Sequence, residues 1–374
     1  MATKLTAAGE ARQERLAGSA DGGPVAPDSA IVGGYRPWLD GLRAVAVLLV
    51  VVQHTLGQIP VELGSLGVGL FFALSGYLIT SLLLDERALR GSVSLRRFYL
   101  RRAARLVPAL VAVVVVCDAF FALQGDGAAL KASLYALTYT ANYAQVVGED
   151  LVPAFGPTWS LAVEEHFYIL WPLALLWFTR RYGLRSALWA TVGVCFAALA
   201  WRATLAELHA QTLIDLGSFE RADALLYGCA AAIAVRLGWR PRQWMLWAGA
   251  AAVASAAYVA YGHVIVSGVV AVGAAAVVVG LDYAAPSWLR RWLSGRALVT
   301  IGILSYGIYL WHGALMHVAS NAGYVGRGWR TVVVLVTFAV AAVSYRCLEA
   351  PIRLWARRRS ARPVPSPGAA MLPD

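Results

Sequence analysis

Long apolar segments separated by short, arginine-rich connections make up most of this chain. Ten of the segments approach the length of about 20 apolar residues that a helix needs to cross a bilayer. They lie near residues 39–57, 65–84, 104–123, 159–178, 186–206, 220–236, 243–261, 263–281, 298–318 and 330–349. The pattern predicts an all-α fold, a polytopic membrane bundle of about ten transmembrane helices.

The positions of the arginines indicate how these helices are oriented. The connection after the second segment holds seven arginines between Arg87 and Arg105, whereas residues 58–64 hold none. Connections rich in Lys and Arg stay in the cytoplasm, so the second connection is predicted to be cytoplasmic. With ten crossings the later arginine clusters and both termini face the cytoplasm as well. Residues 129–147 are also apolar, but an eleventh crossing there would reverse the later clusters, so we interpret them as a re-entrant or interfacial segment.

Composition supports this class and argues against others. Hydrophobic residues make up 59% of the 374 residues and charged residues only 14%, which is typical of a protein in the plasma membrane or bacterial inner membrane. The net charge of +11 comes mostly from arginines beside apolar segments, so we attribute it to topology and expect no nucleic-acid partner. The four cysteines stand singly without metal-ligand spacing, and we expect neither a disulfide nor a metal site.

The chain divides into one membrane domain and two polar ends. Residues 1–34 are polar and rich in Ala and Gly, and they are expected to form a disordered cytoplasmic tail. Residues 35–356 would form the membrane domain, and residues 357–374 a basic, Pro-rich cytoplasmic tail.

Ionisable side chains inside the first segment are the first candidates for function. Arg43 and His54 are eleven residues apart, about three helical turns, so they project from nearly the same face, which Asp40 shares. Such groups are costly at membrane depth and usually have a role. The structural alternative is an arginine that extends to one interface and a histidine that faces a cavity, and these residues alone do not decide between the two.

Other polar residues are predicted toward the outer side of the bundle, as His54 is. Glu164 and Glu165 are adjacent carboxylates in the fourth segment, and at most one of them could face lipid. Tyr309 and His312 lie on one helical face of the ninth segment. A polar network that only fixes helix packing is the structural alternative.

A dense basic run leads into the third segment from the predicted cytoplasmic side. Within residues 96–108, Arg102 and Arg105 are three residues apart, so a helix would present a cluster of guanidinium groups. Guanidinium groups bind phosphates through paired, charge-assisted hydrogen bonds. Ordinary positive charge at a cytoplasmic connection is the alternative interpretation.

Six motifs in order resemble those of the acyltransferase-3 family of integral-membrane O-acyltransferases, over about residues 35–355. They are DGLRAVAVLLVVVQH (40–54), FFALSGYLIT (71–80), RRAARLVPAL (101–110), TWSLAVEEHFYILWP (158–172), RADALLYG (221–228) and SYGIYLWH (305–312). The resemblance implies a ten-helix membrane domain. It also implies transfer of an acyl group, acetyl or a longer short-chain acyl, from cytoplasmic acyl-CoA to a hydroxyl, with no permanently bound cofactor.

The resemblance also implies roles for individual residues. The family's Arg and His, separated by ten residues, correspond to Arg43 and His54, and its cytoplasmic arginine pair to Arg102 and Arg105. Acyl-CoA is expected to contact the three arginines. His54 is expected to remove the acceptor's proton, because imidazole titrates near neutral pH.

The remaining roles stay open at the level of sequence. Either Glu164 or Glu165 would orient His54, and the other would bind the acceptor. Contacts with the substrate or the transition state are expected from Ser75, Trp159, Arg221, Asp223, Tyr309 and His312. One departure is His166, where many relatives have Gln, and it leaves open whether a second imidazole joins the site.

The acceptor and two rival functions remain to be weighed. No fused extracytoplasmic domain is evident, which favours a small or lipid-linked acceptor. A macrolide-like natural product or glycoside is slightly preferred over a surface glycan.

A proton-coupled transporter would use similar intramembrane groups. Carriers, however, often have two halves with matching interrupted helices, whereas these motifs crowd the first four segments. A glycan-binding membrane protein without catalysis is the third possibility, and the intact His54 and glutamates argue against it.

Overall fold

The computed structural model describes residues 34–56, 62–125, 128–149, 151–256, 264–324 and 326–360. Every regular element in these ranges is helical. The bounds are α2 (Pro37–Leu56), α3 (Leu63–Arg90), α4 (Leu95–Leu123), α5 (Ala128–Leu137), α6 (Ala141–Val146), η1 (Pro153–Phe155), α7 (Thr158–Arg181), α8 (Gly183–Glu207), α9 (Gln211–Leu216), α10 (Ala222–Arg236), α11 (Gln243–Ala256), α12 (Val264–Tyr283), α13 (Ser287–Leu293), α14 (Arg296–Asn321), α15 (Arg327–Ser344), η2 (Tyr345–Glu349) and α16 (Ala350–Ser360). The all-α bundle expected from the sequence is confirmed.

Within the described ranges, eight helical segments are long and apolar enough to cross a membrane. The ten expected segments all contain helix, but α10 has 15 residues and α11 has 14. At 1.5 Å per residue such helices reach about 22 Å, less than the roughly 30 Å of a bilayer core. Eight of the ten expected spans meet this measure within the described residues. Helix α11 ends where the described part stops, since residues 257–263 lie outside it, so the count of about ten stays a prediction.

The doubtful apolar stretch at residues 129–147 does not cross the membrane. It contains α5 with ten residues and α6 with six, and both are too short for a span. The expectation of a re-entrant or interfacial segment agrees with this. The predicted orientation, with both termini in the cytoplasm, stays a prediction.

The ends of the chain change one predicted boundary. Residues 1–33 and 361–374 lie outside the described residues. The boundary expected after residue 356 falls inside α16, which continues to Ser360. Residues 357–360 therefore extend a membrane-domain helix, because the helical pattern continues through the basic run.

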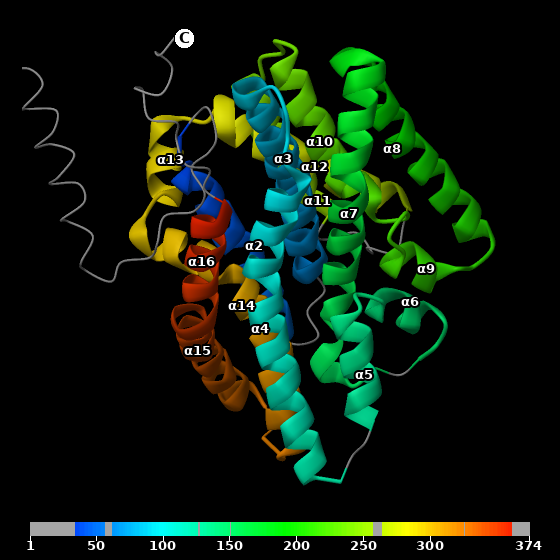
Figure 1. Cartoon of the computed structure of the whole chain (residues 1–374). Helices are drawn as coiled ribbons and strands as arrows, with labels where there is room; N and C mark the ends of the chain where they lie inside the picture. The colour runs from blue at the N-terminus through cyan, green and yellow to red at the C-terminus, as the bar shows by residue number, and fades with distance from the viewer. Residues whose placement is uncertain are drawn as a thin grey trace, which may run out of the picture.

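Close helix packing at glycines holds the centre of the bundle together. A Cβ at Gly76 of α3 would overlap the carbonyl of Leu225 in α10, and a Cβ at Gly302 of α14 would overlap the carbonyl of Asp40 in α2. Small residues at helix contacts allow such close approach in membranes. As a result α3 lies close against α10, and α14 lies close against α2. In Figure 1, α4 passes in front of α14, with α15 and α16 on one side and α7 and α8 on the other.

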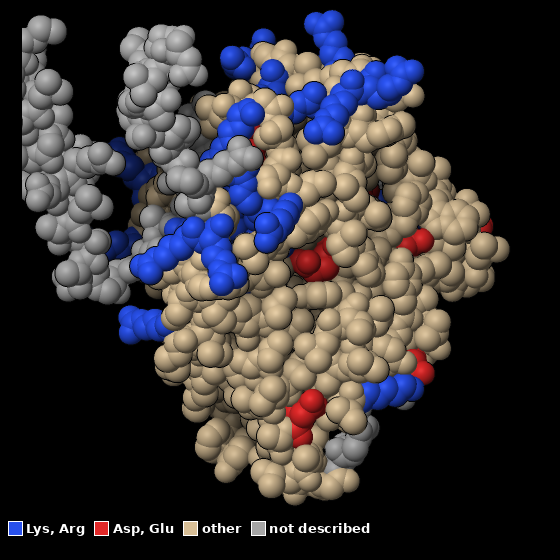
Figure 2. Space-filling model, viewed as in Figure 1, with Lys and Arg blue, Asp and Glu red and all other residues tan. Residues whose placement is uncertain are grey.

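Positive charge is concentrated toward one end of the molecule. Figure 2 shows most of the visible Lys and Arg side chains in the upper half of the view, and a largely uncharged surface below. This asymmetry agrees with the expected gathering of arginines on one side of the membrane.

Candidate functional site

A pocket toward the arginine-rich end is bounded by residues of four helices, α2, α3, α4 and α16. We call it the arginine pocket; its volume is about 170 Å³. Its arginines are Arg36, Arg43, Arg101, Arg102, Arg105, Arg353 and Arg357. Asp40 is the one acidic side chain among the described residues that line it. The pocket therefore suits a ligand that carries several negative charges.

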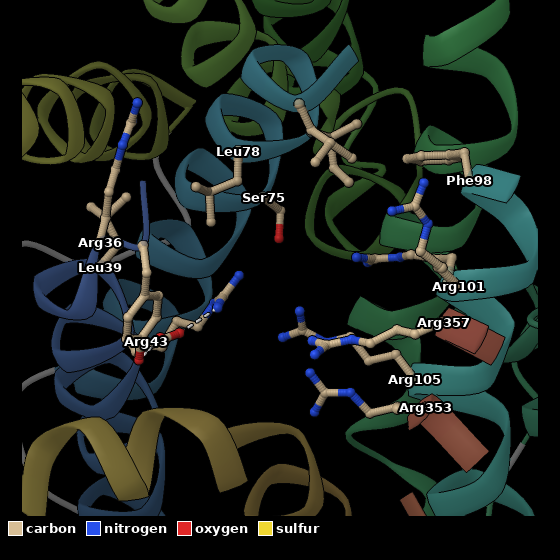
Figure 3. Close-up of a pocket in the computed structure, with 15 residues that line it drawn as sticks. Arg36, Leu39, Arg43, Ser75, Leu78, Phe98, Arg101, Arg105, Arg353 and Arg357 are labelled. Carbon is tan, nitrogen blue, oxygen red and sulfur yellow. Dashed lines mark hydrogen bonds and ion pairs between the residues drawn. The ribbon is translucent and has the colours of Figure 1, made fainter. Parts of the chain in front are cut away.

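Arg43 is held at one wall of the arginine pocket by its neighbour on α2. Its Nη1 donates to Asp40 Oδ1 at 2.7 Å, and Asp40 Oδ2 also accepts from the Tyr35 hydroxyl at 2.9 Å. Asp40 lies one helical turn before Arg43, so the pair shares a helix face, as the sequence predicted. In Figure 3 the Arg43 side chain extends toward the space in front of Ser75.

The two adjacent glutamates lie beside Arg102. Glu164 accepts a hydrogen bond from the Ser75 hydroxyl at 2.8 Å and lies 3.9 Å from Arg102 Nη2. Glu165 lies 3.6 Å from Arg102 Nε, and the guanidinium stacks 3.3 Å from the centre of the Tyr168 ring. One cation thus faces two carboxylates. Arg102 is thus engaged with two carboxylates within the bundle.

A larger chamber lies toward the other end of the bundle and contains two histidines. We call it the histidine chamber; its volume is about 880 Å³. His54 and His312 both line it, with ring centres 5.0 Å apart. Other described lining residues bring aromatic, amide and carboxylate groups: Trp159, Tyr309, Gln53, Gln145, Asn321 and Glu62.

Both imidazoles are oriented by backbone carbonyls. His54 Nδ1 lies 2.8 Å from the Val50 carbonyl oxygen, and His312 Nδ1 lies 2.5 Å from that of Tyr309. A carbonyl oxygen only accepts, so in each neutral ring the hydrogen is on Nδ1 and Nε2 keeps its lone pair. His312 Nε2 is buried without a hydrogen-bond partner among the described residues.

This geometry corrects one expectation. Neither Glu164 nor Glu165 orients His54, because the Val50 carbonyl holds its Nδ1 and the glutamates bond toward Ser75 and Arg102. Near the end of a helix, a side chain can contact the backbone carbonyl four residues earlier. Because this contact needs no particular residue at the earlier position, the sequence did not predict it.

A third cavity adjoins both the arginine pocket and the histidine chamber. Its volume is about 70 Å³. It shares Arg43, Ser75, Arg102 and Arg105 with the arginine pocket. It shares Val68 and Tyr309 with the histidine chamber. The three cavities therefore follow one another through the bundle. The one with the smallest volume lies in the middle, and we call it the narrow cavity.

Tyr309 is fixed at the boundary between the narrow cavity and the chamber. Its hydroxyl lies 2.7 Å from the Ser160 hydroxyl and 3.0 Å from the Pro157 carbonyl oxygen. Ser75, Arg105 and Tyr309 thus lie at the cavities, and their contacts with the donor or the acceptor stay predictions. Arg353 and Arg357 were missed, since the sequence placed one at the end of the membrane domain and the other in a tail.

Arg221 and Asp223 are placed differently from the other expected substrate contacts. Asp223 forms a buried ion pair with Arg202 at 2.5 Å, and Arg202 also donates to the Ser267 hydroxyl at 2.9 Å. The Arg221 guanidinium lies 6.0 Å from the centre of the Trp159 ring. Neither residue is among the described lining residues of the three cavities. The geometry gives Asp223 a helix-packing role, so its contact with substrate stays a prediction.

His166 lies away from the paired histidines. Its Nδ1 is 2.7 Å from the Ser218 hydroxyl, and its ring stacks on Tyr143 at 5.9 Å between centres. The residue is absent from the described lining of the histidine chamber. The geometry thus gives no support to a second imidazole from this position in the site.

These features define the class, a multi-pass membrane helix bundle in which an arginine-lined pocket and a histidine chamber adjoin a common cavity. The family described as "Acyltransferase domain" matches residues 36–348, and the chain belongs to this acyltransferase family. The resemblance inferred from the six motifs is confirmed.

Curated relatives cover most of this chain. It is 31% identical over 350 residues to "Peptidoglycan O-acetyltransferase OatA" of Listeria monocytogenes serovar 1/2a, with 85% of this chain and 56% of that protein covered. It is 29% identical over 357 residues to "O-acetyltransferase OatA" of Staphylococcus aureus (strain NCTC 8325 / PS 47), with 85% and 57% covered. The chain therefore spans a little over half the length of these relatives. No solved structure matches it.

Proposed function

We propose that this protein is a membrane O-acyltransferase. It would take a short acyl group, such as acetyl, from acyl-CoA at the arginine pocket and pass it to a hydroxyl in the histidine chamber. The observation that carries this proposal is the row of three adjoining cavities, with cationic groups at one end and two imidazoles at the other. A donor and an acceptor entering from opposite ends would meet at the narrow cavity.

The arginine pocket supports the choice of donor. CoA carries a diphosphate and a ribose phosphate at one end and its thioester at the end of a long, flexible arm. Phosphates bind guanidinium groups through charge-assisted hydrogen bonds. Among the described residues no carboxylate lies within ion-pair distance of Arg105, which leaves its guanidinium available to a phosphate, whereas Arg102 is paired with Glu164 and Glu165. The thioester arm would extend into the narrow cavity.

The histidine chamber supports the chemistry of transfer. The acceptor oxygen would attack the thioester carbonyl carbon while His54 Nε2 takes the hydroxyl proton. The new C–O bond forms, the C–S bond breaks, and the CoA thiolate leaves and receives the proton that His54 has taken, which regenerates the neutral imidazole. His312 Nε2, which carries only a lone pair in its neutral form, would accept a hydrogen bond from the acceptor or share the proton with His54.

The negative oxygen of the transition state needs a hydrogen-bond donor. Ser75, Trp159 and His312 are the candidates for this donor. Ser75 already donates its hydrogen to Glu164. Neutral His312 has no hydrogen on the nitrogen that lacks a partner. The indole N–H of Trp159, which lines the chamber, is therefore the candidate that we favour.

For the acceptor we favour a glycan hydroxyl over a macrolide-like product. Aromatic and amide side chains of the chamber are groups that pack against sugar rings and bond their hydroxyls. The relatives are named for O-acetyl transfer, one of them to peptidoglycan. A glycoside of a natural product would present the same hydroxyls, so it is the second candidate.

The proposal is tested with the full chain in lipid nanodiscs, radiolabelled acetyl-CoA and two acceptor panels, soluble peptidoglycan fragments and glycosylated macrolides. We expect an alkali-labile acetyl ester on a glycan fragment. Label on a macrolide alone would reject the glycan acceptor and retain the donor. If no ester forms and the protein instead conducts protons in liposomes, the transporter alternative replaces the enzyme.

The two neighbouring arginines should respond differently to substitution. Arg105→Gln should raise KM for acetyl-CoA roughly tenfold with little change in kcat, because it removes a charge-assisted phosphate contact. Arg102→Gln should mainly lower kcat and thermal stability, because it leaves two half-buried carboxylates without their cation. Steady-state kinetics with acetyl-CoA as the varied substrate separates the two. Equal KM effects from both variants would reject the distinction.

A further inference from the structure

Helix α16 forms one wall of the arginine pocket. Arg353 and Arg357 are four residues apart, so they lie on one face of the helix, and both line the pocket. Figure 3 shows their side chains beside that of Arg105, with all three directed into the space opposite Arg43. These residues come from opposite ends of the chain and meet only in the folded protein.

The two arginines differ from the other basic residues of the same helix. Arg353 and Arg357 are half-buried, whereas Arg358 and Arg359 are exposed. Arg353 Nη1 lies 3.5 Å from the Tyr345 hydroxyl, which helps to hold the side chain at the pocket. Ala356, between the two, is buried in a helix that contacts α4. Helix packing therefore fixes which face of α16 meets the pocket.

The charges around the arginine pocket favour binding of an anion. Carboxylates in the described part of the chain pair with three of its arginines, Arg36 with Asp282, Arg43 with Asp40, and Arg102 with the two glutamates. The Glu349 carboxylate also interacts with Arg105 and Arg353. Seven arginines line the pocket, so positive charge still exceeds negative charge there. Like charges repel each other at short range, and a polyanionic ligand would relieve that repulsion.

The family match ends at residue 348, so α16 lies beyond it. We propose that Arg353 and Arg357 bind phosphate groups of the nucleotide part of the acyl donor, and that α16 thereby selects CoA over donors that carry only the pantetheine arm. This inference rests on the proposed acyl-CoA donor. The two arginines are binding residues, distant from the imidazoles that would handle the acceptor's proton.

The test measures equilibrium binding of three probes, CoA, 3′-dephospho-CoA and pantetheine, to the full chain in nanodiscs. The variants are R353Q, R357Q, the double variant and R358Q. R358Q is a matched control, because it removes the same charge from an exposed position of the same helix. The lysine variants R353K and R357K keep the charge and lose the planar fork. Unfolding temperature verifies that each variant is folded.

We expect the Kd for CoA to rise roughly tenfold for each glutamine variant and less for each lysine variant. The double variant should bind CoA and 3′-dephospho-CoA with more nearly equal Kd, and its weak binding of pantetheine should match wild type. R358Q should change the Kd for CoA less than threefold.

Two negative results have separate meanings. If wild type binds CoA and R353Q and R357Q behave like R358Q, α16 has no part in donor binding and the inference is wrong, while the proposed function stands. If wild type binds no CoA, the donor in the proposed function is wrong and the inference is rejected with it.

Discussion

Replacing His54 with Ala is expected to lower kcat for acyl transfer by about 10²–10⁴-fold, the usual contribution of a general base. The exposed imidazole lines the histidine chamber with Nε2 as its available base, since Nδ1 is held by the Val50 carbonyl. Its removal should leave the fold intact, because the ring takes little part in core packing. The measurement is ester formation from labelled acetyl-CoA at saturating donor.

His166→Ala is the matched control for this experiment. It removes an imidazole that bonds to Ser218 and lies outside the described lining of the chamber. This variant should keep most of the activity. Both variants should bind CoA as wild type does, because neither residue lines the arginine pocket. A His54→Ala variant with more than a tenth of wild-type kcat would show that another group takes the proton.

Breaking the Arg202–Asp223 pair is expected to produce the largest loss of stability. Both side chains are buried, and they join α8 to α10, with Ser267 of α12 bonded to the same guanidinium. Arg202→Ala removes the cation that is bonded to the buried Asp223 carboxylate, a loss that costs about 3–5 kcal/mol in the free energy of unfolding. Replacing both residues with Leu should cost less, because neither charge of the pair is then left without the other.

Unfolding in detergent micelles with increasing denaturant measures these changes. Arg185→Ala, at an exposed position of the same helix, is the control and should change the free energy of unfolding by no more than about 0.5 kcal/mol. Asp223→Asn also separates the packing role from a role in the site. Wild-type stability with lost acceptor binding in that variant would restore the substrate contact expected from the sequence.

The helical spacing on α2 could be predicted because it is a local property. The pairing of Asp40 with Arg43 follows from residues three apart on a helix, and the structure places His54 on the same helix at the chamber. The number of membrane spans was harder to predict from the sequence. Apolar composition locates a helix, but whether α10 and α11 are long enough to cross depends on where each helix ends.

Contacts between helices were the part that sequence could not supply. Glu164 and Glu165 were correctly recognised as unsuited to lipid, yet their partners, Ser75 and Arg102, come from two other helices. Asp223 looked equally available for substrate until its partner Arg202 was placed beside it.

By itself the sequence determined a helical membrane protein of the acyltransferase family, because apolar length and short ordered motifs are encoded along the chain. Only the tertiary structure decided which ionisable groups adjoin one another. The cost of burying charge forces each to find a partner or a cavity, and those partners are set by how distant helices pack. The clearest example is that Arg353 and Arg357 line the same pocket as Arg43, which lies more than 300 residues earlier in the chain.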